Sequence, residues 1–316
     1  MPLTIDPEDS LATYTRNKVP INPPRLHVAH LSDLHFVTHP VLRGVKFGGM
    51  YGHDSVALTA LETQLVGMAI DLLFVTGDLT TWGDKASLTY ARQFMRGLGR
   101  RLNLTPEQVH FIPGNHDVLI DYYRVTSGSR NFTQVFGDIP LLRTLNVKGF
   151  EVAIFSFDST FRSGLWPFTS NRGQILPTAF NAFNRAQQEL ADRELVRIVQ
   201  LHHHPLPVPY KTDDGVKGVL TTMTNGATFA DRMQECGVHV ILHGHEHFPY
   251  SCKISYHPDQ NATVVVSAGT ASQVGNREIS FNYLTITPRV GVALTQYVYR
   301  ETGFAISRDA TRVFDW

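Results

Sequence analysis

Five short apolar segments of this 316-residue chain each run directly into a cluster of chemically versatile polar residues. Stretches with apolar residues at helical spacing separate several of them, so the repeating order is strand, polar cluster, helix. This order is typical of α/β proteins, in which binding sites form at the carboxyl ends of parallel strands. We therefore expect a single sheet to gather the five clusters at one edge. The segments and their clusters are 25–31 with Ser32-Asp33-Leu34-His35, 72–76 with Gly77-Asp78, 108–112 with Pro113-Gly114-Asn115-His116-Asp117, 195–201 with His202-His203-His204-Pro205, and 238–242 with His243-Gly244-His245-Glu246-His247.

The other sequence patterns complete the predicted fold. Apolar residues at helical spacing predict four helices, over 54–69, 85–100, 178–192 and 227–235. Later in the chain, short apolar runs predict strands over 250–256, 263–267, 281–287 and 292–299. Because no long helix separates those strands, we expect them to form a second, more antiparallel sheet. The predicted fold class is α/β, a four-layer αββα sandwich of two mixed β-sheets flanked by helices.

Closely spaced prolines set the beginning of the chain apart from the rest. Proline lacks a backbone N–H and restricts the residue before it, so residues 1–24 are predicted to be an irregular lead-in. Residues 25–316 are predicted to form a single domain. Two long segments without clear periodicity, 117–146 and 158–177, are candidates for the rim of a pocket.

The charge balance restricts the classes of partner. The chain carries 28 Lys and Arg residues against 28 Asp and Glu residues, a formal net charge of zero. Nucleic-acid polymers and anionic membranes are bound through concentrated positive surfaces, so neither is an expected partner. No run approaches the roughly 18 apolar residues of a spanning helix, and the first 25 residues lack the apolar core of a secretory signal. We expect a cytoplasmic protein that acts on a small molecule, as a monomer or as a homo-oligomer.

Histidine is concentrated in the polar clusters, which hold eight of the fifteen histidines in the chain. Taken singly, several of the clusters are also common turn or strand-end sequences. Taken together, they supply imidazole, carboxylate and amide donors, which suit zinc, manganese, iron or cobalt better than calcium or magnesium. Two such ions about 3.5–4 Å apart need a bridging carboxylate, and they can activate water for attack on phosphorus. The set therefore predicts two transition-metal ions (Mn, Fe, Zn or Co) as cofactors.

The ordered pattern Asp-x-His, Gly-Asp, Gly-Asn-His-Asp, His-x-Pro, Gly-His-x-His resembles that of the calcineurin-like metallophosphoesterases. Within that superfamily it is most similar to the class III cyclic-nucleotide phosphodiesterase and glycerophosphodiesterase branch. The family's ligand lies two residues before the proline of its fourth motif, which selects His203; His202 would then be a strand residue. The resemblance implies seven metal ligands, with Asp33, His35 and His247 on the first ion, Asn115, His203 and His245 on the second, and Asp78 bridging both.

The resemblance also implies catalytic roles beside the metals. His116 would hydrogen-bond a phosphate oxygen or protonate the leaving alkoxide, and Asp117 would either orient His116 or brace the loop. Thr81 stands where purple acid phosphatases place a tyrosine ligand, so the iron–tyrosinate bond of those enzymes is not expected.

The implied reaction is attack of a metal-bound hydroxide on a small phosphate ester. A phosphodiester such as a cyclic nucleotide or a glycerophosphodiester is the favoured substrate. Two alternatives stay open: a phosphomonoesterase of the same fold, and a non-catalytic metal-binding scaffold. A scaffold would have no need of His116, which favours an enzyme.

Overall fold

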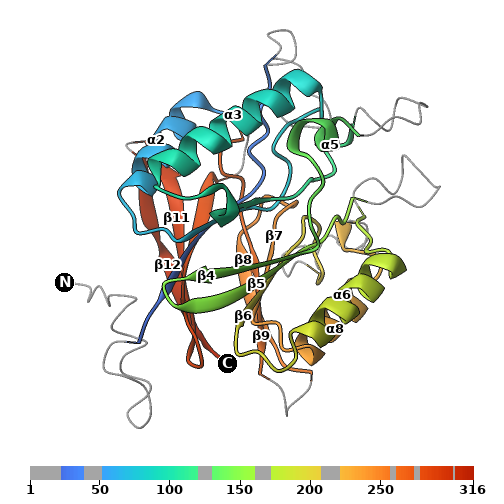
Figure 1. Cartoon of the computed structure of the whole chain (residues 1–316). Coiled ribbons are helices and arrows are strands. Elements are labelled where there is room, and N and C mark those ends of the chain that lie inside the picture. Colours follow the sequence, from blue (N-terminus) through green and yellow to red (C-terminus); the bar gives the residue numbers. More distant parts are fainter. Residues whose placement is uncertain are drawn as a thin grey trace.

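Two six-stranded sheets pack face to face in the computed structural model, and helices cover both outer faces (Figure 1). The four-layer αββα sandwich of two mixed sheets is confirmed. The structure describes residues 23–38, 52–119, 130–160, 172–207, 221–256, 261–273, 278–301 and 303–316. Most of the predicted lead-in, residues 1–22, lies outside the described residues, as do 120–129 and 161–171 of the two segments predicted to be irregular.

The first sheet has the strand order β12-β11-β10-β1-β2-β3. Its parallel half pairs β1 with β2 and β2 with β3, and its antiparallel half runs from β1 through β10 and β11 to β12. Three helices, α2, α3 and α5, accompany this sheet (Figure 1). The bounds are β1 Leu26–Leu31, β2 Leu72–Val75, β3 Val109–Phe111, β10 Ser280–Thr287, β11 Gly291–Arg300, β12 Gly303–Asp315, α2 Ser55–Val66, α3 Lys85–Arg101 and α5 Asn131–Phe136; a short 3-10 helix, η1 (Pro106–Gln108), precedes β3.

The second sheet has the order β4-β5-β6-β7-β9-β8 and is parallel except at its two outer strands. Helices α6 and α8 lie side by side on its outer face (Figure 1). None of the helices in the described part of the chain has the length and apolar character needed to cross a membrane. The bounds are β4 Leu142–Val147, β5 Phe150–Ser156, β6 Val196–Gln200, β7 Val240–His243, β8 Tyr250–Ile254, β9 Thr263–Ser267, α6 Pro177–Glu189 and α8 Gly226–Glu235.

Successive side chains of the central strands point to opposite faces of the sheet, and each face packs into a different core. The strands are therefore apolar on both faces. In β1, Val28 packs between the two sheets in the same cluster as Ile198 of β6. Its neighbour Ala29 points the other way, into the cluster that contains Leu61 of α2. A third cluster joins the outer face of the second sheet to α6 and α8. Each fully buried aliphatic side chain of this kind contributes about 1.5–3 kcal/mol relative to an exposed one.

Two expectations about sheet membership are wrong. The strands after residue 249 do not form a sheet of their own: β8 and β9 join the second sheet, whereas β10, β11 and β12 join the first. The five polar clusters do not follow strands of one sheet either, because β6 and β7 belong to the second sheet. An apolar run identifies a strand, but strand pairing depends on partners far away in sequence. The segment 117–146, predicted to be irregular, also contains α5 and β4.

Candidate metal centre

The five polar clusters meet where the carboxyl ends of β1, β2 and β3 adjoin those of β6 and β7. Backbone hydrogen bonds align the loops that follow β1 and β2: Asp33 N donates to Gly77 O over 3.0 Å, and His35 N donates to Asp78 O over 3.0 Å. A single sheet-like ladder thus continues past the ends of both strands. It fixes the positions of Asp33, His35 and Asp78 relative to one another.

Left-handed backbone conformations are concentrated at this site. Of eight non-glycine residues with positive φ among those described, five are candidate metal ligands. Such conformations are uncommon for residues other than glycine, and they persist where the surrounding structure enforces them, often at functional sites. The five are Asp33 (φ 55°), His35 (φ 51°), Asp78 (φ 51°), His245 (φ 81°) and His247 (φ 54°).

Two glycines allow the loops to approach one another closely. A Cβ at Gly77, whose φ is +92°, would lie 2.5 Å from His202 Nδ1. A Cβ at Gly244 would lie 1.8 Å from Ser32 Oγ and 2.7 Å from Asp33 Oδ2. Side chains at these positions would therefore push the loops of the two sheets apart.

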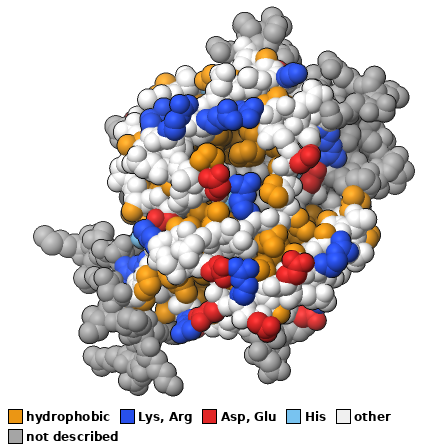
Figure 2. All heavy atoms as spheres, in the orientation of Figure 1, with side chains coloured by type: hydrophobic (Ala, Val, Ile, Leu, Met, Phe, Trp, Pro, Cys, Tyr) orange, Lys and Arg blue, Asp and Glu red, His pale blue; other side chains and the backbone are white. Residues whose placement is uncertain are grey.

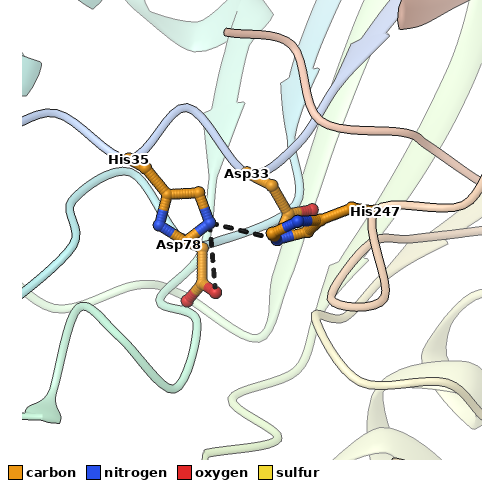
Figure 3. Close-up of side chains that lie close together, drawn as sticks. All are labelled: Asp33, His35, Asp78 and His247. Atoms are coloured by element: carbon orange, nitrogen blue, oxygen red, sulfur yellow. Dashed lines mark hydrogen bonds and ion pairs between the residues drawn. The ribbon is translucent and has the colours of Figure 1, made fainter. Parts of the chain in front are cut away.

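Four buried side chains, Asp33, His35, Asp78 and His247, point toward one another and form the first donor cluster (Figure 3). His247 Nε2 lies 3.1 Å from Asp33 Oδ1 and 3.1 Å from His35 Nε2. His35 Nε2 lies 3.9 Å from Asp78 Oδ2. Donor atoms bound to one ion at about 2.0–2.2 Å lie about 3 Å apart or slightly more. Asp33 Oδ1 is buried and accepts no hydrogen bond from the described residues, so the cluster fits a metal ion.

A second donor cluster, Asp78, His202 and His245, shares Asp78 with the first. His202 Nε2 lies 3.4 Å from Asp78 Oδ2. Asn115 Oδ1 joins this cluster, at 3.0 Å from His202 Nε2 and 3.0 Å from His245 Nδ1. One carboxylate therefore faces donors on both sides, the arrangement that a bridge between two ions requires.

The three consecutive histidines occupy different environments. His202 lies just beyond β6, which ends at Gln200, so the expectation that it is a strand residue is wrong. Its Nδ1 contacts Thr76 O over 2.7 Å and its Nε2 faces Asn115 and Asp78. His203 contacts Ser159 Oγ through Nδ1 over 2.9 Å, and its ring lies 4.5 Å from that of His245. The structure thus brings His202 into the donor cluster and places His203 beside it.

His116 and Asp117 contact different parts of the site. His116 Nδ1 lies 2.9 Å from the carbonyl oxygen of Thr81, and the His116 ring lies against that of His35 with centroids 5.1 Å apart. Asp117 accepts hydrogen bonds from the backbone N–H groups of Gly114 (2.9 Å), Leu79 (3.0 Å) and Thr80 (2.7 Å) and from the Thr80 hydroxyl (2.9 Å). These contacts tie the Asp78 loop to the Asn115 loop. A backbone carbonyl such as that of Thr81 has no sequence signature, so this partner of His116 could not have been found from the motif.

Burial and neighbouring charges prepare most of the donors for metal binding. Burial lowers the pKa of His35 to about 3, although Asp78 opposes the shift. Burial and the adjacent His203 and His202 hold the pKa of His245 well below its usual value. Burial disfavours the charged form of Asp78, but the nearby His202, His116 and His35 outweigh it and hold that pKa well below its usual value. Neutral imidazoles and ionised carboxylates are the forms that bind metals.

His202 differs from the other histidines of the two donor clusters. Burial opposes its protonation, but the charge of Asp78 and a hydrogen bond to it, together with Asp33, raise its pKa to about 9. Without metal, the His202–Asp78 contact is therefore an ion pair near neutral pH. A cation that binds both side chains must displace the imidazole proton.

Comparisons with known proteins identify the family and the fold of the chain. The family model described as calcineurin-like phosphoesterase matches residues 26–249. The fold is similar to that of a dimetal phosphatase from Danio rerio, with a TM-score of 0.60 and 11% identity, covering 93% of this chain and 99% of that one. It is also similar to that of a purple acid phosphatase from yellow lupin seeds, with a TM-score of 0.55 and 15% identity, covering 93% of this chain and 53% of that one. A search of the curated proteins gave no significant match.

Proposed function

The chain belongs to the calcineurin-like phosphoesterase family, and from that premise we propose that it hydrolyses small phosphate esters, with phosphodiesters as its preferred substrates. The observation that carries the proposal is the pair of buried donor clusters that share Asp78. A cytoplasmic location and a small-molecule substrate remain parts of this proposal, with the chain acting as a monomer or as a homo-oligomer.

The proposed ligand assignment follows the two donor clusters. Asp33, His35 and His247 would hold the first ion, and Asn115 and His245 would hold the second together with a histidine of the triplet, His202 or His203. Asp78 would contribute to both sites. When bound, two such ions supply Lewis acidity, which offsets negative charge on the phosphoryl oxygens and makes nearby water more acidic. Manganese, iron, zinc and cobalt all suit this mixed set of nitrogen and oxygen donors.

His116 provides the proton for the leaving alcohol in the proposed reaction. Its Nδ1–H donates to the Thr81 carbonyl, which leaves Nε2 as the nitrogen able to exchange a proton with the substrate. The contact with the His35 ring places His116 beside the first donor cluster. A positioned acid of this kind contributes roughly 10²–10⁴-fold to the rate. A scaffold protein would gain nothing from it.

The preference for a phosphodiester rests on the resemblance of the motif order to the phosphodiesterase branch. A diester carries one negative charge on phosphorus, and two metal ions would be able to neutralise that charge.

Steady-state hydrolysis of two chromogenic substrates tests the proposal. The metal-loaded protein should hydrolyse bis-p-nitrophenyl phosphate with a higher kcat/KM than p-nitrophenyl phosphate. Asp78→Asn should abolish both activities, because an amide bridges two cations poorly. Asp315→Asn is the matched control: this exposed carboxylate pairs with Lys253 and belongs to neither donor cluster, so its loss should leave both activities intact.

A phosphomonoesterase is the second candidate, because both similar structures reported above are described as phosphatases. A higher kcat/KM for p-nitrophenyl phosphate would select it and reject the diester preference. Absence of turnover with manganese, iron, zinc and cobalt would reject the enzyme and favour a metal-binding scaffold.

A further inference from the structure

A groove opens on the side of the sandwich where both sheets end. β3 is the last strand of the first sheet and β4 is the first strand of the second. The groove lies between these strands, the carboxyl-terminal half of α3 and the end of α5, and its volume is about 540 Å³. Ligand pockets typically have volumes of about 300–1,000 Å³. Its lining includes none of the candidate metal ligands and not His116.

The floor of the groove is apolar. The rings of Phe111 and Phe136 lie 4.6 Å apart, and both line it. Leu104 and Val109, both half-buried, extend the apolar surface, and Met95 lies buried beneath it. Apolar surface gathered in a concave site can bind the apolar face of a partner.

Four arginines surround this floor. Arg92, Arg96 and Arg100 follow one another at four-residue spacing along α3, so they share one face of the helix. They span eight residues, or about 12 Å along the axis. Arg143 of β4 also lines the groove. Figure 2 shows basic side chains in a row along α3 above an apolar recess, with another basic side chain beneath it.

The positive charge of the groove is not neutralised by its described surroundings. Among the residues that line it there is no Asp or Glu. Within the described part of the chain, no carboxylate forms an ion pair with any of the four arginines; the Arg100 side chain donates only to the backbone carbonyl of Arg96. Figure 2 shows acidic side chains at the edge of the recess, one of them beside the basic side chain below it. A chain with no net charge thus concentrates four cations around one apolar groove.

We propose that this groove binds an acidic amphipathic helix of a partner protein. The apolar face of such a helix would cover the Phe111–Phe136 floor, and Glu or Asp residues one turn apart would pair with the arginine row on α3. Charge complementarity along 12 Å or so selects this occupant over an amphiphile with one anionic head, which needs a single cation. The apolar floor selects it over a nucleic-acid duplex, which presents its charged backbone with the base faces stacked inside.

Fluorescence anisotropy with the full chain and designed peptides tests the proposal. The probe is a peptide of about 14 residues, four helical turns, with leucines on one face and glutamates beside them. A scrambled peptide of the same composition keeps the charge but removes the apolar face. The amphipathic peptide should bind at least tenfold more tightly than the scrambled one, and its affinity should fall when salt is raised from about 50 to about 300 mM.

Matched arginine variants locate the binding site. Arg96→Gln and Arg143→Gln should each weaken binding of the amphipathic peptide roughly three- to tenfold, the effect of losing one charge-assisted contact. Arg185→Gln removes an exposed arginine of α6, on the second sheet, and should change binding less than twofold. All three variants should keep the melting temperature of the parent protein, because none removes an ion pair of the described residues.

Three results would overturn the proposal. The first is equal binding of the amphipathic and scrambled peptides, which would leave only general charge attraction. The second is unchanged affinity in both groove variants. The third is tighter binding of laurate or of a single-stranded oligonucleotide than of the peptide, which would identify the groove as a site for an amphiphile or a nucleic acid.

Discussion

The proton-transfer role that we propose for His116 depends on a single backbone contact. The Thr81 carbonyl accepts from Nδ1 and leaves Nε2 for the substrate. His116→Gln should therefore lower kcat for bis-p-nitrophenyl phosphate by roughly 10²–10⁴-fold. The number of bound metal ions should not change, because His116 belongs to neither donor cluster. Metal analysis of the same samples checks this, and His239→Gln serves as a distant control. If His116→Gln loses metal, the residue is a ligand and the assigned role is wrong.

The histidine triplet gives a second test at the scale of single residues. His202 lies within 3.4 Å of Asp78, whereas His203 lies beside His245 and contacts Ser159. On this geometry His202→Ala should reduce the metal content from two ions to one, and His203→Ala should lower affinity less. Asp78 raises the pKa of His202 to about 9, so the His202 imidazole is protonated at about pH 7.5 in the metal-free protein. Metal binding at that pH should therefore release a proton from the parent protein and not from His202→Ala.

Calorimetry in buffers of different ionisation enthalpy measures that proton release. Loss of the second ion only in His203→Ala would restore the assignment that the family pattern implies.

Motif order predicted which side chains would gather, but not how each one is oriented. Asp33, His35, Asp78 and His247 form one cluster in the structure, as their order suggested they would. The choice within the triplet could not be made from spacing, since it depends on where β6 ends and how the next residues turn. The left-handed backbone at the candidate ligands was equally invisible, because Asp and His carry no local signal for positive φ comparable to that of glycine.

Asp117 acts at the scale of loops. Its carboxylate accepts three backbone N–H groups and the Thr80 hydroxyl, which joins the loop after β2 to the loop after β3. Asp117→Asn replaces one acceptor oxygen with a donor and should destabilise the fold by about 1–3 kcal/mol. It should also weaken metal binding, since Asp78 and Asn115 lie on the two loops. Urea unfolding and manganese titration measure both effects. Unchanged stability with reduced kcat alone would instead indicate that Asp117 orients His116.

Many elements with a clear pattern were predictable. The helix expected over 85–100 is observed as α3, Lys85–Arg101, because its apolar positions recur regularly around one face. β5 was missed although residues 152–155 form a buried apolar run. β4 was missed because most of its residues are half-buried or exposed, so that it lacks an apolar run. β12 was missed at the edge of the first sheet, where Ile306 and Val313 are exposed. The pattern of an edge strand reflects its position in the sheet as much as its own burial.

The candidate metal centre depends on both sheets of the molecule. The loops after β1, β2 and β3 supply Asp33, His35, Asp78 and Asn115, whereas the loops after β6 and β7 supply the remaining histidines. Packing of Val28 against the second sheet therefore helps to bring the two halves of the site together. The sequence alone could not assign the strands to two sheets, because that assignment is made by long-range contacts in the core.

Buried neutral histidines outside the donor clusters make stability depend on pH. Burial and the nearby His243 lower the pKa of His30 to about 3, and burial and Arg143 lower that of His110 to about 3. Both pKa values lie below the value of about 6.5 that histidine has in an unfolded chain. Between about pH 3 and about pH 6.5, the unfolded chain therefore binds more protons than the folded chain. Stability is therefore complete above about pH 6.5 and falls as pH decreases, with the two groups together contributing about 3 kcal/mol per unit at most.

Urea unfolding of His110→Phe in the presence of a chelator tests this pH dependence. The phenyl ring can keep the stacking on Phe74 without binding a proton. As pH falls from about 6 to about 4, the free energy of unfolding should decrease less steeply in the variant than in the parent. The two slopes should differ by about 1.4 kcal/mol per pH unit. Parallel stability curves for the two proteins would show that His110 is not held neutral by burial.

The proposed function requires that one carboxylate, Asp78, join two metal sites. Electron paramagnetic resonance of the protein loaded with manganese(II) tests this sharing, because two ions that share a ligand are magnetically coupled. We expect two ions per chain and the spectrum of an exchange-coupled pair, which Asp78→Asn should abolish. A single ion per chain with the spectrum of isolated manganese would show that Asp78 is not shared.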